Sequence, residues 1–188
     1  MGFVPEDRLG RGPVPDMSLA ENALLTAHRM GMVRLGLVQP EKVRDFALDA
    51  ITRFGVQCAG PQAAARSLSG GNLQKFILGR EMLQDPPLLV VSQPTWGVDV
   101  GAAAFIRQSL IEMRNNGAAI LVVSEELDEL FEICDRIAVI ARGRLSPPKP
   151  VRETSVEEIG LWMSGIWPGR CAGAQAIEGE GAAGAHQA

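Results

Sequence analysis

The spacing of apolar residues predicts a chain whose first third is helical. Apolar positions recur with a helical period over residues 40–54 and again over residues 73–82. Ser18 and Glu21 have the spacing of a capping box, in which the serine hydroxyl and the glutamate carboxylate each accept a hydrogen bond from a free backbone amide, so another helix is expected to begin there. The residues before it, 3–17, are rich in proline, glycine and charge and predict a short strand that runs into a loop.

The pattern changes in the middle of the chain. Three uniformly apolar runs, 87–91, 118–124 and 136–141, are separated by segments with a helical period over 104–116 and 125–133. Uniformly apolar strands that alternate with helices indicate a parallel sheet buried on both faces. An α/β core is therefore expected after the helical part.

The end of the chain carries weaker signals. Residues 142–145 are expected to turn back as an antiparallel edge hairpin. Ser155 and Glu158 repeat the capping-box spacing and predict a short helix that ends near Met163. Residues 170–188 are rich in alanine and glycine and lack bulky apolar side chains, which predicts a disordered tail.

Composition and charge narrow the classes of function. The 188 residues fit one domain, or a domain with tails, and a net charge of -4 provides no basic field for a nucleic-acid backbone, so nucleic acid is excluded as the main partner. Three separated cysteines, Cys58, Cys134 and Cys171, fit a reducing compartment, for which the cytosol is the default. No apolar run approaches the roughly 18 residues of a membrane span. A span, if needed, would come from a partner subunit.

The stretch LSGGN, residues 68–72, is the first candidate for chemistry. A helix N-terminus presents unpaired amides and the positive end of the helix dipole, so Ser69, Gly70 and Gly71 could bind a phosphate through backbone N–H groups. The alternative is a plain serine N-cap followed by glycines in a tight turn.

The order of several motifs resembles the second half of an ABC-transporter ATP-binding domain, and specifically the sugar and nucleoside importer ATPases. LSGGNLQK (68–75) is similar to their signature motif, and PLLVVSQPTWGVDVGA (87–102) to the strand and loop that carry Walker B and the D-loop. VPEDR (4–8) and VPDMSLAEN (14–22) are similar to the stretch after their Q-loop. The resemblance runs over about residues 3–165.

The resemblance implies an α/β fold, the C-terminal part of a P-loop NTPase (ABC) domain that has a parallel sheet core plus an N-terminal helical subdomain and lacks its P-loop half. It implies a strand and loop after the Q-loop position over 1–17 and the helical subdomain over 18–67. The signature helix and α/β core with a C-terminal helix would occupy 68–169, ahead of the tail at 170–188. A core without its P-loop strand and helix is expected to expose apolar sheet faces.

Several positions depart from the family pattern. The chain has no G-x-x-x-x-G-K-[ST] loop, and none of its lysines follows a glycine. Ser92 and Gln93 stand where Walker B has its metal-binding Asp and its catalytic Glu, Glu125 replaces the usual His, and Glu6 replaces the Q-loop Gln. Ser92 and Gln93 are neutral, so they provide neither a general base nor an anionic metal ligand. The chain alone is expected to be inactive, with no catalytic residue and no metal ligand of its own.

These departures look like the degenerate second nucleotide-binding domain of the tandem importer ATPases. In that arrangement Ser69, Gly70, Gly71 and Asn72 would contact ATP in trans, completing a site whose Mg²⁺ is held by a partner nucleotide-binding domain. Asp99, at the D-loop position, would lie at the domain interface, or would simply cap the following helix.

The resemblance implies an ATP-binding component of an ABC importer for nucleosides or simple sugars. Its partners would be the second nucleotide-binding domain, the transmembrane permease subunits and, indirectly, a substrate-binding protein. Its place would be peripheral, on the cytoplasmic face of the plasma (inner) membrane. The alternative is a truncated interaction module that binds permease or partner ATPase without a nucleotide role.

Overall fold

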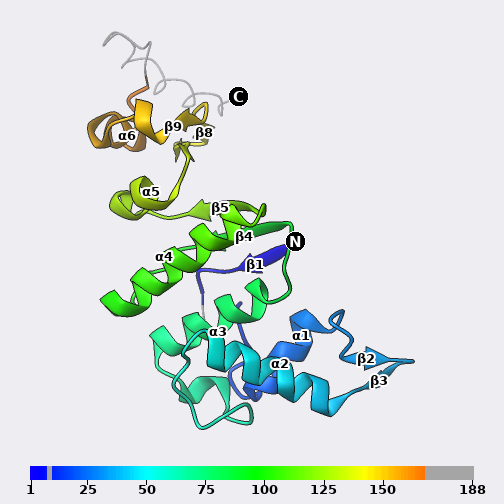
Figure 1. The fold of residues 1–188 in the computed structure, drawn as a ribbon. Coiled ribbons are helices and arrows are strands. Elements are labelled where there is room, and N and C mark those ends of the chain that lie inside the picture. Colours follow the sequence, from blue (N-terminus) through cyan, green and yellow to red (C-terminus); the bar gives the residue numbers. More distant parts are fainter. Residues whose placement is uncertain (8–9, 168–188) are drawn as a thin grey trace, which may run out of the picture. The chain divides into compact units, whose positions relative to one another are not determined.

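The computed structural model describes residues 1–7 and 10–167, which form two compact units, one ending at Cys134 and one beginning at Asp135 (Figure 1). The first unit contains β1 (Gly2–Val4), α1 (Leu19–Ala27), β2 (Val33–Arg34), β3 (Leu37–Val38), α2 (Pro40–Arg53), a 3-10 turn (Ala65–Ser67), α3 (Gly70–Met82), β4 (Leu88–Ser92), α4 (Val100–Asn115), β5 (Ala119–Val123) and α5 (Leu127–Ile133). The second contains β6 (Arg136–Ile137), β7 (Ile140–Ala141), β8 (Arg144–Leu145), β9 (Lys149–Pro150), a 3-10 turn (Val151–Glu153) and α6 (Val156–Met163).

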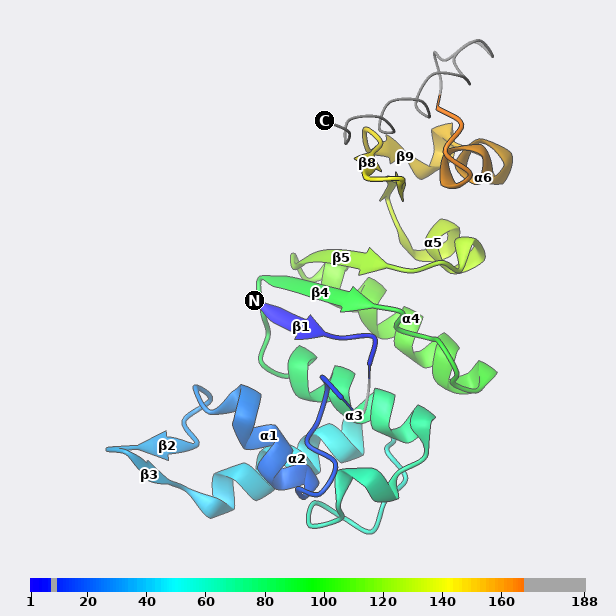
Figure 2. The ribbon, with the colours of Figure 1, turned by 180° about the vertical axis from the view of Figure 1, so that it is seen from behind.

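A parallel sheet with the strand order β1-β4-β5 lies at the centre of the first unit. Val4 pairs with Val91, and Val91 pairs with Val122. The sheet face that carries these side chains is covered, since its fully buried residues include Val4, Leu89 and Val91. Figures 1 and 2 show α4 against one face of the strands, in front of them in Figure 1 and behind them in Figure 2, with α3 beside β1. The predicted α/β core is confirmed for these strands.

The opposite face of the sheet is open. Phe3, Val90 and Leu121 form one row across the three strands, and Phe3 and Leu121 keep 52% and 55% of their surface exposed. Val123 and Leu88 beside them are 49% and 37% exposed. Within the first unit, Figure 2 shows no helix in front of this face. The prediction that the sheet is buried on both faces is therefore wrong, whereas the expectation of an exposed apolar face is confirmed.

Helices α1 and α2 begin where the sequence predicts. Ser18 and Glu21 form the predicted capping box, since the amide of Ser18 donates to the Glu21 carboxylate over 2.8 Å and the amide of Glu21 donates to the Ser18 hydroxyl over 3.1 Å. The backbone hydrogen bond from Ser18 lowers the pKa of Glu21. Pro40 occupies the first turn of α2, where its missing N–H costs no helical hydrogen bond.

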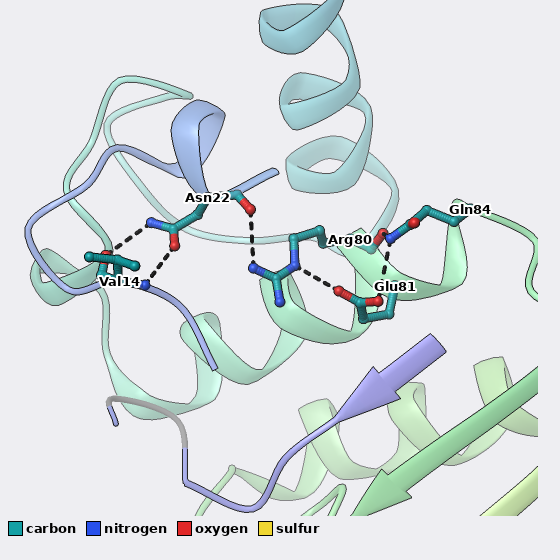
Figure 3. A network of polar contacts seen from close by, with 5 residues as sticks. All are labelled: Val14, Asn22, Arg80, Glu81 and Gln84. Carbon is teal, nitrogen blue, oxygen red and sulfur yellow. Dashed lines mark hydrogen bonds and ion pairs between the residues drawn. The ribbon is translucent and has the colours of Figure 1, made fainter. Parts of the chain in front are cut away.

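A buried polar network fixes α3 against α1 (Figure 3). The guanidinium of Arg80 donates to the Glu81 carboxylate over 2.9 Å and to the carbonyl of Asn22 over 3.2 Å. The Asn22 amide in turn bonds both the N–H and the C=O of Val14, and Gln84 donates to the other Glu81 oxygen. Burial lowers the pKa of Arg80, and the charge of Glu81 opposes that shift. The network holds the helix that carries LSGGN in place.

The second unit differs from the prediction. The apolar run 136–141 does not form a third parallel strand, because its two halves find antiparallel partners within a few residues: β6 pairs with β9, and β7 with β8. Arg142 and Gly143 both have a positive φ, as a tight two-residue hairpin requires, so the predicted hairpin is confirmed. Ser155 caps α6, but the Glu158 carboxylate binds Lys149 rather than completing a capping box. The predicted tail, 170–188, lies outside the described residues.

Candidate functional site

The LSGGN stretch opens α3 at the protein surface. Ser69 is the N-cap, with extended backbone (φ -63°, ψ 155°), and its hydroxyl accepts the amide of Asn72 at 3.5 Å. Ser69 and Gly70 are exposed, and Gly71 and Asn72 are half-buried. The helix start is thus open to solvent rather than covered by its own chain. Its first amides and the positive end of its dipole can receive an anion from outside.

Asn72 connects the helix start to the end of the helical subdomain. Its side-chain N–H donates to the Ser69 hydroxyl over 3.0 Å, and its carbonyl oxygen accepts the amide of Gln57 over 2.9 Å. One turn later, the ammonium of Lys75 donates to the carbonyl of Gly55 over 2.8 Å. Because the Ser69 oxygen accepts from Asn72, its own hydrogen remains available to a ligand.

The D-loop position lies beside the signature glycine. A Cβ atom added at Gly71 would be 3.8 Å from Val98 and 3.9 Å from the Asp99 carboxylate, which is ordinary van der Waals contact. Asp99 caps α4 by accepting the amide of Ala102 over 2.9 Å, as the capping alternative to an interface role expects. That backbone hydrogen bond lowers the pKa of Asp99, and the nearby charge of Lys75 adds to the effect. Gly71 and Asp99 thus form one continuous surface.

The four degenerate positions follow the carboxyl ends of the parallel strands. Glu6 follows β1, Ser92 ends β4 with Gln93 after it, and Glu125 lies just beyond β5. Gln93 has a left-handed backbone (φ 48°), and its amide donates to the carbonyl of Val123 over 2.7 Å. Parallel sheets bind ligands at this edge. Here the edge presents the neutral side chains of Ser92 and Gln93, the two positions at which the sequence resemblance predicts the Walker B carboxylates.

Sequence reasoning missed a buried carboxylate at the same edge. Glu129 on α5 is 4% exposed. The Ser124 hydroxyl lies 3.1 Å from one Glu129 oxygen and 3.3 Å from the Gln93 side-chain oxygen. Among the described residues, the other Glu129 oxygen has no hydrogen-bond partner. The signal was present, since Glu129 shares its helical face with the buried Leu130 and Ile133.

The arrangement can bind an anion but shows no metal-binding set. Within residues 1–7 and 10–167, no group of three or more His, Cys, Asp or Glu side chains is placed to hold a metal ion. Ser92 and Gln93 do not fit Mg²⁺ as anionic ligands, whereas the exposed start of α3 fits a phosphate. No helix in the described part of the chain is long and apolar enough to cross a membrane.

Known proteins similar to this chain are import ATP-binding proteins. It is 44% identical over 166 residues to the nucleoside import ATP-binding protein NupA of Lactococcus lactis subsp. cremoris and 41% identical over 166 residues to the guanosine import ATP-binding protein NupO of Bacillus subtilis. It is 37% identical over 166 residues to the ribose import ATP-binding protein RbsA 2 of Rhizobium meliloti. Each match covers 88% of this chain but only 32% or 33% of the relative. No family model matches the chain.

Solved structures agree on the fold. A dimeric ATP-binding cassette in a post-hydrolysis state, bound to ADP and Pi, superposes with a TM-score of 0.68 at 23% identity and covers 80% of this chain and 62% of its own. An inward-facing ABC transporter of the metal-chelate type superposes with a TM-score of 0.68 at 16% identity and covers 87% and 63%. Together with the similarity to the sequence relatives, this fold places the chain in the ATP-binding protein family of ABC importers, in its sugar and nucleoside group. The chain spans about a third of the length of those relatives.

Proposed function

We propose that the chain is an ATP-binding component of an ABC importer that donates its signature motif in trans to an ATP site on a partner domain. The observation that carries this proposal is the contrast between two regions. Ser69 and Gly70 are exposed at an open helix start, while the strand edge of the same unit presents Ser92 and Gln93 in place of carboxylates. A domain of this kind has the means to hold a phosphate and lacks the groups for hydrolysing it.

Each residue of the signature motif would have its own role in binding the phosphate. The amides of Gly70 and Gly71 and the hydroxyl of Ser69 would bind the terminal phosphate, and the side-chain-free glycines allow its close approach. Asn72 would complete the contact set by fixing the Ser69 hydroxyl. Asp99, beside Gly71, would lie at the interface with the partner domain. Mg²⁺, when bound, would neutralise phosphate charge from ligands on the partner domain.

The proposals for the transported substrate and for the remaining partners are based on the names of the relatives. Two of them are named for nucleoside or guanosine import and one for ribose import, which supports a nucleoside or simple sugar as cargo. We propose transmembrane permease subunits as partners, with the helical subdomain from about residue 19 to residue 66 next to them, and a substrate-binding protein as an indirect partner. The chain would then lie on the cytoplasmic face of the plasma (inner) membrane.

A matched pair of serine variants tests the trans role. Ser69→Asp keeps a good N-cap but puts a negative charge where the phosphate would bind. Ser67→Asp adds the same charge two residues earlier, at another exposed serine. ATP hydrolysis is measured on a partner ATP-binding domain that carries an intact P-loop, with and without this chain. The wild-type chain and Ser67→Asp should stimulate turnover, and Ser69→Asp should abolish the stimulation while leaving the unfolding midpoint nearly unchanged.

Two results would contradict the proposal. One is turnover by the purified chain alone. The other is full stimulation by Ser69→Asp. Binding to the partner domain without any stimulation by the wild-type chain would instead favour the truncated interaction module without a nucleotide role.

A further inference from the structure

The short hairpin formed by β2 and β3 projects from the helical subdomain, beyond α1 and α2 (Figures 1 and 2). Val33 pairs with Val38 and Arg34 pairs with Leu37, and the two residues between them form the turn. Every residue over 33–38 is exposed. The hairpin therefore presents apolar side chains outward from both of its faces.

The turn at the tip of the hairpin is unfavourable for its first residue. Leu35 has a φ of 53° and keeps 94% of its surface exposed. Two-residue hairpin turns of this kind need a positive φ at both central positions, for which asparagine, aspartate and glycine are favoured. A leucine there costs free energy twice, in backbone strain and in apolar surface left in water. Backbone strain of this kind clusters at functional sites, so the exposed leucine indicates a binding contact.

Positively charged residues lie next to the hairpin. Residues 28–45 contain four cationic side chains against two anionic ones, in a chain whose net charge is -4. A Cβ atom added at Gly31 would be 3.6 Å from the Lys42 ammonium, so the start of α2 lies beside the base of the hairpin. The four cations are exposed, and among the described residues they form no ion pair: Arg29, Arg34, Lys42 and Arg44.

An apolar tip with free cations beside it matches the surface of an anionic bilayer. At such a surface, apolar side chains enter the boundary between the headgroups and the acyl chains, and lysine and arginine attract the anionic headgroups. The lipid boundary is fluid and surrounds an inserted tip on all sides. It can therefore cover the apolar side chains on both faces of the hairpin at once.

Two other classes of partner fit less well. A nucleic-acid backbone would pair with the cations but would leave Leu35 and Leu37 in water. A protein partner would need a pocket that encloses both faces of the hairpin, and the core of a protein interface contains few charged residues, whereas Arg34 lies on the hairpin itself.

We infer that the β2-β3 hairpin is a peripheral membrane contact, which inserts Leu35 and Leu37 into the headgroup region of an anionic bilayer. A tip of this size gives weak and reversible binding, so it orients the helical subdomain at the membrane rather than anchoring it. The contact does not involve the signature motif and needs neither nucleotide nor permease. It can therefore be tested separately from the trans role.

The test measures the partition coefficient of the purified chain on lipid vesicles by co-sedimentation. The vesicles consist of phosphatidylcholine alone or of phosphatidylcholine with about 30% phosphatidylglycerol, which supplies the anionic headgroups. The wild-type chain should bind the anionic vesicles about tenfold or more strongly than the neutral ones. Added salt should weaken this binding, because it screens the attraction between the cations and the headgroups.

Leu35→Asn is the decisive variant. Asparagine is favoured at this position of the turn, so the variant should unfold no earlier than wild type. It removes the apolar tip, and its partition coefficient on anionic vesicles should fall about fivefold or more. Arg34→Gln should lower the partition coefficient about fivefold on anionic vesicles and leave it unchanged on neutral ones.

Two control variants separate this contact from other surfaces. Leu121→Asn changes an exposed leucine on the open face of the sheet, and its partition coefficient should stay within about twofold of wild type. Ser69→Asp should also bind the vesicles like wild type, because the trans role is not involved. The inference is overturned if the wild-type chain does not bind anionic vesicles or if Leu35→Asn binds them equally well. It is also overturned if binding requires the permease in the vesicles, since a protein would then cover the tip.

Discussion

The Arg80–Glu81 pair predicts a large and specific loss of stability on mutation. Both side chains are almost fully buried, with 3% and 6% of their surface exposed. Arg80→Met keeps an unbranched apolar side chain but removes the guanidinium. Among the described residues, the Glu81 carboxylate then keeps only the Gln84 amide at 3.3 Å. Removing one partner of a buried ion pair costs about 3–5 kcal/mol, because the remaining charge stays desolvated. Domains have roughly 5–15 kcal/mol of stability in total, so the variant should be close to unfolding.

The assay is urea unfolding of the purified chain, followed by far-UV circular dichroism. Arg53→Met is the control, since the Arg53–Asp49 pair has the same chemistry but 65% and 40% exposure, and exposed pairs contribute about 0.2–1 kcal/mol. The double variant Arg80→Met/Glu81→Met should recover most of the loss, because it leaves no charge without a partner. A loss below about 1 kcal/mol for Arg80→Met, or a double variant no better than the single one, would refute this reasoning.

Three further predictions follow from the packing and the caps. Gly79→Ala should destabilise the chain by about 1–2 kcal/mol in the same unfolding assay, because the added Cβ would lie 2.6 Å from the Phe54 ring and the cost of overpacking exceeds the gain in helix propensity. Unchanged stability would show that the ring moves aside at no cost. Asn72→Ala should lower partner-stimulated ATP turnover more than it lowers the unfolding midpoint, since the Ser69 hydroxyl loses its anchor; equal losses would indicate a purely structural role. The Asp99 carboxylate, titrated by NMR, should have a pKa below the ordinary value. The cap therefore stabilises the fold fully above the unfolded-state pKa, and this stabilisation is lost as the pH falls through the folded-state pKa. An ordinary pKa would contradict the cap.

The sequence predicts local structure well where that structure depends on contacts within one helical turn. Ser18, Ser69 and Ser155 each cap a helix, because a serine hydroxyl reaches an amide three residues later whatever the rest of the fold does. The pairing of β-strands was harder to predict from the sequence. The run 136–141 is equally apolar in a parallel or an antiparallel setting, and only its partners over 144–150 decide between them.

For the candidate site, the motif order indicated which residues matter but not how they touch. The proximity of Gly71 to Asp99 depends on how α3 and α4 pack, which no local pattern encodes. Glu129 falls in the predicted helix 125–133, and its burial against Ser124 comes from the tertiary fold. A charged residue on the apolar side of a short helix is the signal that should be weighted more heavily.

The Gln93–Ser124–Glu129 contacts bear on what a negative charge at position 93 would cost. The single Ser124 hydrogen already lies between two acceptors, so Gln93→Glu would bring a second negative charge to a donor that cannot serve both. Like charges that share one donor repel each other. A carboxylate at position 93 therefore requires a compensating change at Glu129.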